Sequence, residues 1–229
     1  MAVTVPVVLW GAWRLMNDQE FQLLGTFVSR VEVTSPLVAL TIDDGPGESV
    51  WELLRTLDAV NVRATFFVNG LALSEDPRKG RALISAGHEL GNHTFSHRRM
   101  IFRSQGFIGN EIERTDALIQ QAGQRGPILF RPPYGKKLLA LPYYLMRTRR
   151  VSVMADIQPD SRRRLRDAAA MVRYTLDETK PGSIVLLHAL GLRASHDAIP
   201  GIVAGLRSRG YRFVTTSELL AEASTASSQ

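Results

Sequence analysis

Along residues 36–222, short apolar runs alternate with amphipathic stretches. The apolar runs are rich in β-branched residues and end at Gly, Pro or a polar residue, which is typical of buried strands. They lie at 38–42, 64–68, 128–130, 151–155, 183–187 and 211–214. The stretches between them space apolar residues three and four apart, which predicts helices at 49–60, 77–86, 109–122, 164–179, 198–209 and 217–222. Strands that alternate with helices favour parallel βα units and therefore an α/β fold.

The alternation continues through residues 36–222 without a break in composition, so we predict a single domain over that range. Polar residues gather where the apolar runs end. In α/β barrels the active site lies at that end of the strands, and we expect the functional residues there. Residues 223–229 are small and polar, which predicts a flexible tail.

Residues 1–35 form an N-terminal segment whose stretch 2–15 is apolar. This stretch contains Arg14 and is shorter than the ~20 residues that a membrane-spanning helix needs. Two interpretations stay open. The stretch packs on the domain as an extension, or it is a weak signal anchor with Trp10 and Trp13 at a membrane interface.

Composition limits the chemistry that is open to the chain. The 229 residues contain no cysteine, which excludes disulfides, thiolate nucleophiles and cysteine-ligated zinc. A metal ion would therefore bind to His, Asp or Glu. The net charge of +6 suits an anionic partner such as nucleic acid, a wall polymer or a membrane surface. Arginines cluster at 162–166, but no aromatic residues alternate with them as in a groove for single-stranded nucleic acid, so we interpret this cluster as a solvated helix face.

Asp43 and Asp44 follow the apolar run 38–42 directly and precede a Gly-Pro pair. Adjacent side chains of a regular strand point to opposite faces, but the Gly-Pro pair breaks the strand, so both carboxylates can turn toward its end. Two carboxylates this close repel unless a cation lies near. One interpretation is a metal site in which one aspartate is a ligand and the other a base. The alternative is a turn whose aspartates cap the next helix.

His93 and His97 are four residues apart. On a helical turn this spacing puts both imidazoles on one face, as in other metal sites of the His-x-x-x-His type. One aspartate and two histidines make three protein ligands and leave an open position for water. That donor set is typical of a catalytic rather than a structural metal site. Surface histidines in a polar loop are the alternative.

Further polar groups follow other predicted strands. Arg131 begins Arg-Pro-Pro-Tyr-Gly over residues 131–135, a stiff loop that can aim backbone N–H groups at an oxyanion. Its guanidinium can hold a carboxylate. His188 ends a buried run and is a candidate general acid, although such histidines are often core residues. Either Asp156 or Asp160 can orient it.

Together these residues resemble the polysaccharide deacetylase family, also called the NodB-homology domain or carbohydrate esterase family four. Five motifs stand in the family's order: Thr-Ile-Asp-Asp-Gly-Pro at 41–46, Ala-Thr-Phe-Phe-Val at 64–68, His-Thr-Phe-Ser-His at 93–97, Arg-Pro-Pro-Tyr-Gly at 131–135 and Leu-His at 187–188. The family's Asp-x-x-Asp-Trp motif is altered, because Ser161 stands where Trp is expected. This change removes part of the apolar pocket expected beside the acetyl methyl group.

The resemblance implies a distorted (β/α) barrel and a bound divalent metal ion. The metal is most often zinc, with Co²⁺, Ni²⁺ or Mn²⁺ as alternatives. By position in the motifs, Asp44, His93 and His97 are the implied metal ligands.

The resemblance also implies the catalytic roles. Asp43 is the implied base and Arg131 its partner. The backbone N–H of Tyr134 is expected to stabilise an oxyanion. His188 is the implied acid, and Asp160 fits best as the residue that supports it.

The implied function is the removal of N-acetyl groups from an N-acetylglucosamine-containing polysaccharide, either a chitin-like oligomer or peptidoglycan. Alternatives are an O-acetyl esterase acting on xylan or another glycan, a sugar-binding homologue without activity, and nucleic-acid binding through the arginines. We expect a polysaccharide or oligosaccharide substrate, no nucleic-acid partner and weak membrane association through the N-terminus. An extracytoplasmic location, in the cell envelope or secreted, is favoured over a cytoplasmic one.

Overall fold

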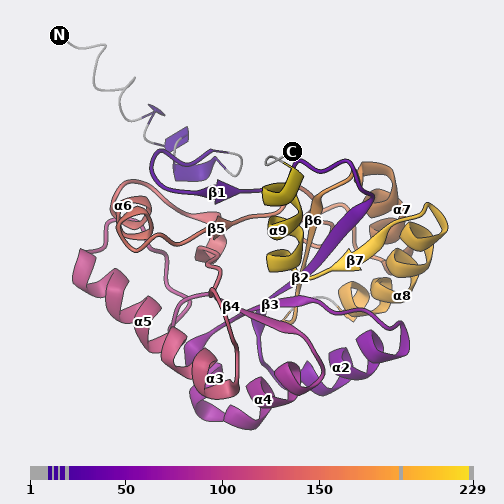
Figure 1. The fold of residues 1–229 in the computed structure, drawn as a ribbon, viewed down its shortest axis with the longest axis horizontal. Coiled ribbons are helices and arrows are strands. Elements are labelled where there is room, and N and C mark those ends of the chain that lie inside the picture. Colours follow the sequence, from indigo (N-terminus) through magenta and orange to yellow (C-terminus); the bar gives the residue numbers. More distant parts are fainter. Residues whose placement is uncertain (1–9, 12, 15, 19–20, 191–192, 227–229) are drawn as a thin grey trace.

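The computed structural model describes residues 10–11, 13–14, 16–18, 21–190 and 193–226. Most of the helices form an arc around a central group of strands (Figure 1). The strands are β1 (Phe27–Val28), β2 (Leu37–Gly45), β3 (Thr65–Val68), β4 (Glu89–Asn92), β5 (Ser152–Val153), β6 (Ser183–His188) and β7 (Arg212–Val214). The helices are α2 (Val50–Ala59), α3 (Gly70–Glu75), α4 (Pro77–Ser85), α5 (Gln105–Ala122), α6 (Ala140–Arg147), α7 (Ala168–Glu178), α8 (Arg193–Ser208) and α9 (Thr216–Ala226), with a 3₁₀ turn η1 (Pro133–Gly135).

Strand β2 is the centre of the sheet. One edge pairs in parallel with β6, over Val38 to Asp43. The other edge pairs in parallel with β7 at its beginning and with β3 at its end. Strand β4 continues the sheet beyond β3, also in parallel. Because all these strands run the same way, their carboxyl ends meet at one edge, where the sequence predicts the functional residues.

Isolated parallel bridges extend this pairing. Asn92 at the end of β4 pairs with Phe130, and Phe130 pairs with Ser152 of β5. Ile157, a few residues further, pairs with Val185 of β6. The predicted α/β fold with parallel strands is confirmed. Within the described residues, the regular strands alone do not close into a barrel, since single bridges make these last connections.

The core explains why β2 is apolar on both faces. Val38, Leu40 and Ile42 belong to one buried cluster, which packs against helices such as α2 and α8. Leu37 and Ala39 belong to a second cluster on the opposite face. A parallel strand that is covered on both sides must be apolar at successive positions rather than at alternate ones.

Several predicted boundaries are wrong. Helix α7 begins at Ala168 instead of residue 164, because Asp167 accepts a hydrogen bond from the Ala170 N–H and caps the helix there. The arginines at 162–166 therefore lie in a turn and not on a helix face. The predicted strand at 128–130 is reduced to the bridge at Phe130. Helices α3 and α6 and strands β1 and β4 are elements that the apolar pattern did not predict.

The structure tests the predictions for the two ends of the chain to different extents. Helix α9 continues through Ala226, so the first part of the predicted tail at 223–229 is helical. Most of the apolar stretch 2–15 lies outside the described residues, and its two interpretations stay predictions. No helix in the described part of the chain has both the length and the apolarity to cross a membrane.

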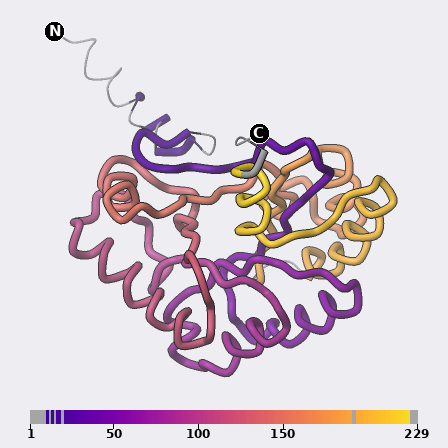
Figure 2. The backbone as a smooth tube through the Cα atoms, in the orientation of Figure 1, coloured from indigo at the N-terminus to yellow at the C-terminus, as the bar shows by residue number. Residues whose placement is uncertain are grey.

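Residues 27–37 are tied to the strands by backbone contacts. Figure 2 shows the chain around β1 lying beside the segment that carries β5, with which it pairs. Gly182, just before β6, donates to the Leu37 carbonyl and accepts from the Val31 N–H. Its φ is +81°, and an added Cβ would lie 1.7 Å from the Val31 carbonyl oxygen. Only glycine fits this close approach of two backbones.

We expect Gly182→Ala to lower the free energy of unfolding by about 3 kcal/mol or more, because the new Cβ collides with rigid backbone. Gly210→Ala is the matched control, since Gly210 has φ +85° but nothing within 4 Å of an added Cβ. It reports the conformational penalty alone, about 1 kcal/mol. Urea unfolding measures both variants. Equal losses would contradict the predicted collision.

Candidate metal and catalytic centre

Asp43 and Asp44 lie at a β-bulge near the end of β2. The strand continues through Gly45, and its register against β3 shifts between Asp43 and Gly45. Asp44 has a φ of 65°, in the left-handed region. The bulge turns adjacent carboxylates toward the same cavity, which both line. The alternative in which they cap the next helix is wrong, because the N-cap of α2 is Ser49.

His93 and His97 lie in the loop after β4, and this loop is not helical. The helical turn assumed from their spacing is therefore wrong. Thr94 and His97 instead have positive φ values of 69° and 54°. This backbone brings the two imidazole rings to a centroid distance of 4.9 Å. The Thr94 hydroxyl accepts a hydrogen bond from the His97 N–H and closes the turn.

Polar side chains whose role was not predicted from the sequence hold this loop in place. Glu111 of α5 accepts hydrogen bonds from the backbone N–H and the hydroxyl of Ser96, both at 2.8 Å. Asn92 accepts from the Thr94 N–H and donates to Asp116 of α5. Glu111 and Asp116 are buried. The sequence does place these acidic residues on the apolar face of a helix. A buried charge requires partners, so this placement was the feature from which their role could have been predicted.

The structure brings Asp44, His93 and His97 together as a candidate metal site. One ligand atom from each residue lies within 4.8 Å of the others. Asp44 Oδ1 is 3.1 Å from His97 Nε2 and 3.7 Å from His93 Nε2. This oxygen is buried and accepts no hydrogen bond from the described part of the chain. A divalent cation between these atoms would satisfy it, so the residues fit such an ion.

The tautomer and protonation state of His93 suit a metal ligand. Its Nδ1 is 2.8 Å from the Arg131 carbonyl oxygen, which can only accept, so Nδ1 carries the proton. The lone pair of Nε2 then faces Asp44. Burial lowers the pKa of His93, against the opposing effect of the Asp43 and Asp44 charges. A neutral imidazole whose other nitrogen donates to a carbonyl is the usual form of a metal-ligating histidine.

Arg131 is buried and fixes Asp43. Its Nη1 donates to Asp43 Oδ1 at 2.7 Å and to the Thr41 hydroxyl at 2.8 Å. Its Nε and Nη2 donate to the carbonyls of Val153 and Met154. Asp43 therefore has one oxygen held by the guanidinium, and the other lies 3.8 Å from His93 Nε2.

His188, at the end of β6, is oriented by Asp160. Its Nδ1 is 3.1 Å from Asp160 Oδ1, and its backbone N–H donates to Oδ2 at 2.7 Å. Asp156 instead accepts from the Ser183 hydroxyl and the Ile184 N–H. Burial lowers the pKa of His188, but the hydrogen bond and charge of Asp160, together with the charges of Asp43 and Asp44, outweigh burial and raise this pKa to about 9.

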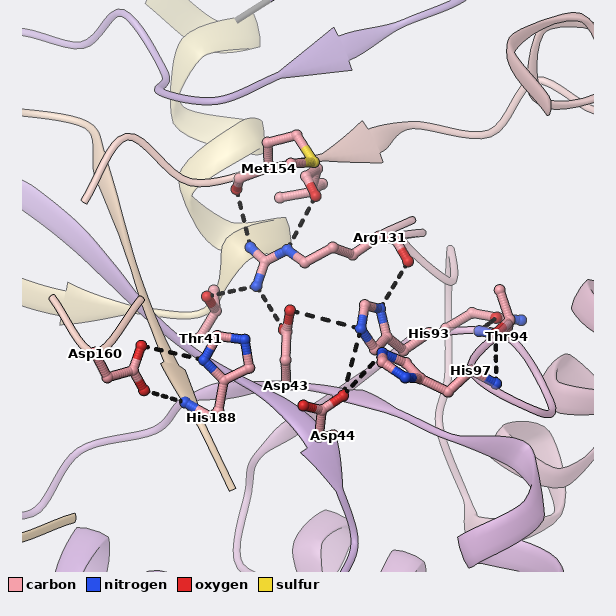
Figure 3. A network of polar contacts seen from close by, with 12 residues as sticks. Thr41, Asp43, Asp44, His93, Thr94, His97, Arg131, Met154, Asp160 and His188 are labelled. Carbon is pink, nitrogen blue, oxygen red and sulfur yellow. Dashed lines mark hydrogen bonds and ion pairs between the residues drawn. The ribbon is translucent and has the colours of Figure 1, made fainter. Parts of the chain in front are cut away.

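The network surrounds one cavity of about 320 Å³. Figure 3 shows Asp43 and Asp44 in the middle, with His93 and His97 to one side and His188 with Asp160 to the other. Tyr134 lies on the rim in η1 with a φ of 58°. Its N–H makes no hydrogen bond to the described residues, so it is available to a ligand. The cavity is lined by Asp43, Asp44, His93, His97, Arg131, Pro132, Tyr134, Gly135, Met154, Gln158, Ser161, Leu186 and His188.

Residues 30–151 match the family model described as polysaccharide deacetylase. The chain belongs to the polysaccharide deacetylase family. A relative in this family, the peptidoglycan-N-acetylglucosamine deacetylase of Bacillus cereus, is 31% identical over 213 residues, which cover 90% of this chain and 98% of that protein. The resemblance carried by the five motifs is thereby confirmed.

Solved structures of family members share the fold. The crystal structure of the Bc1960 peptidoglycan N-acetylglucosamine deacetylase, in complex with a benzamide, matches with a TM-score of 0.79 at 28% identity, over 84% of this chain and 92% of that one. A CE4 family pseudoenzyme from Bacillus anthracis matches with a TM-score of 0.78 at 25% identity, over 87% of this chain and 70% of that one. Other curated relatives are longer, and the chain spans between 30% and 66% of their length.

Proposed function

We propose that this chain is a metal-dependent hydrolase that removes N-acetyl groups from the N-acetylglucosamine units of peptidoglycan. One observation carries the proposal: Asp44, His93 and His97 converge around an unsatisfied carboxylate oxygen. An acidic group, Asp43, and a histidine, His188, lie in the same cavity. Relatives named peptidoglycan-N-acetylglucosamine deacetylases support the choice of polymer.

Asp44, His93 and His97 would hold the metal ion. Two imidazoles and one carboxylate with an open position suit catalytic zinc best, and Co²⁺, Ni²⁺ or Mn²⁺ are accepted by the same donors. When bound, such an ion supplies Lewis acidity, which polarises a carbonyl and lowers the pKa of water from ~16 toward ~7.

Asp43 is the proposed general base. Arg131 holds its Oδ1, so Oδ2 is the oxygen left to accept the proton of the attacking water. The guanidinium is itself fixed by the carbonyls of Val153 and Met154, so the carboxylate cannot rotate freely. A base held in one orientation takes the proton without first being reordered.

Tyr134 and His188 are proposed to act on the amide. The Tyr134 N–H would donate to the oxyanion that forms as water adds to the carbonyl, and loss of one such donor typically costs ~3 kcal/mol. His188 is protonated over a wide pH range because Asp160 raises its pKa to about 9. It would give its Nε2 proton to the departing amine, which is a poor leaving group without that proton.

The proposed substrate also suggests where the protein acts. Peptidoglycan lies outside the cytoplasmic membrane, so we propose an extracytoplasmic location, in the envelope or secreted. In this proposal residues 36–222 are the catalytic domain, to which residues 27–35 also belong through β1 and Val31. The part of the N-terminal segment before β1 contributes weak membrane association.

We expect acetate release from peptidoglycan glycan strands to stop after chelation and to return when Zn²⁺ is added. Asp43→Asn should lower kcat by about 10³-fold, because the amide cannot take the proton from water. The same variant should bind Zn²⁺ with nearly unchanged affinity, since Asp43 is not among the three ligands. Acetate assays and calorimetric Zn²⁺ titration measure the two effects, and thermal melting reports whether the variant is folded.

Metal-loaded wild-type protein that binds the glycan but releases no acetate would refute the hydrolase proposal and favour a sugar-binding protein without activity. Full activity in Asp43→Asn would remove Asp43 from the role of base. Release of acetate only from O-acetylated glycans would instead identify an esterase.

The His188–Asp160 contact predicts a specific pH dependence. The acid works only while His188 is protonated, so activity should fall as pH rises through its pKa of about 9. Asp160→Asn removes the charge that raises this pKa, and the fall should move to lower pH by about one unit or more. Asp156→Asn is the control, because Asp156 is hydrogen-bonded to the same strand but does not contact His188. The pH profile of kcat measures this shift. If activity fell at the same pH in Asp160→Asn as in the wild type, Asp160 would not be the residue that raises the pKa of His188.

A further inference from the structure

A second cavity adjoins the candidate centre on the His188 side. It has a volume of about 260 Å³, and His188 and Ser161 line both it and the central cavity. Its other walls include Arg162, Arg163 and Arg166, which together we call the arginine turn. The arginine turn precedes α7, and its side chains are exposed.

A third cavity of about 600 Å³ shares a lining residue with the other two. Ser161 lines all three cavities, and Arg162 lines the second and the third. Ser161 occupies the position where the family motif has Trp. Its exposed hydroxymethyl group takes up less space beside these cavities than an indole would.

The positive charge of the arginine turn is not neutralised within the described part of the chain. No carboxylate there forms an ion pair with Arg162, Arg163 or Arg166. Asp160, which also lines the second cavity, is buried and bonded to His188. The carboxylates of the third cavity are engaged as well: Glu32 pairs with Arg30, and Asp156 bonds to the strand β6.

Two contacts give the arginine turn a defined arrangement. The Arg162 guanidinium lies 4.3 Å from the centroid of the Tyr174 ring of α7, a cation–π contact. Arg166 Nε donates to the Arg163 carbonyl at 3.0 Å. These contacts use one face of Arg162 and one nitrogen of Arg166, and the remaining donors are left to a ligand. A guanidinium with free paired N–H groups recognises a carboxylate in a bidentate manner.

We propose that the arginine turn binds a carboxylate carried by the sugar unit next to the one that is deacetylated. The proposal rests on the proposed function and names a feature of its substrate. His188 would protonate the amine, which stays on the sugar, so a cavity that His188 lines lies within reach of the sugar that keeps this amine. A glycan strand whose alternate units carry a carboxylate therefore fits this surface better than a neutral polymer.

The test compares two glycans that differ only in this charge. One is a peptidoglycan glycan oligomer with free carboxylates on alternate sugars, and the other is the same oligomer with these carboxylates converted to methyl esters. Binding is measured by calorimetry with Zn²⁺-loaded Asp43→Asn protein, so that turnover does not interfere. The ratio of kcat/KM for the two glycans in the wild-type background is the second measurement.

We expect the charged oligomer to bind about tenfold more tightly than its ester, which corresponds to the gain from one bidentate pair. The combined substitution Arg162→Gln, Arg163→Gln and Arg166→Gln should reduce this ratio to near one. Arg164→Gln is the matched control, since Arg164 is exposed in the same turn but lines none of the three cavities. It should keep the ratio of the unsubstituted protein.

Equal dissociation constants for the charged and esterified oligomers would overturn the inference, whatever the activity of the protein. A single-stranded oligonucleotide that competes as well as the charged glycan would also overturn it, because the turn would then be a general polyanion surface. A clear preference for the charged glycan in a protein that releases no acetate would support the carboxylate subsite and refute only the proposed hydrolysis.

Discussion

The candidate centre depends on one buried cation, the guanidinium of Arg131. It donates to Thr41 and Asp43 of β2 and to two carbonyls of the segment that contains β5, while the Arg131 carbonyl accepts from His93. A buried charge is costly unless every donor is paired, so arrangements that leave this group unpaired are disfavoured. The contacts of Arg131 thus link the end of β2, the segment that contains β5 and the loop after β4 that carries His93 (Figure 3). These contacts of Arg131 position the metal ligands and the proposed base.

Around Arg131, several polar side chains are positioned by backbone conformations that residues other than glycine rarely adopt. Asp44, Thr94, His97 and Tyr134 all have positive φ, and all lie in or beside the cavity. Each such conformation costs on the order of 1 kcal/mol and persists only where the surrounding contacts determine it. Here those contacts are the β-bulge, the closing hydrogen bond of Thr94 and the anchor of Ser96 on Glu111. The strain is concentrated where the geometry of the centre requires it.

Much of this arrangement follows from the sequence, because apolar runs locate buried strands and parallel strands bring their carboxyl ends together. That logic predicted where Asp43, Arg131 and His188 would meet. The helical turn for His93 and His97 was wrong because a spacing of four does not determine the backbone between two residues. The strand at 128–130 was overpredicted since its pairing is a single bridge that depends on tertiary neighbours. The N-cap at Asp167 makes helix α7 begin after the arginine turn. This cap could have been predicted, since the sequence has an Asp directly before an alanine-rich run.

The central claim is that one divalent cation binds between Asp44, His93 and His97 while Asp43 stays outside its coordination. Anomalous diffraction from crystals of the Zn²⁺-loaded protein, recorded on both sides of the zinc absorption edge, tests it most directly. We expect a single strong peak about 2.0–2.2 Å from one Asp44 oxygen and from Nε2 of both histidines. A peak elsewhere, or coordination by Asp43 in place of Asp44, would contradict the account.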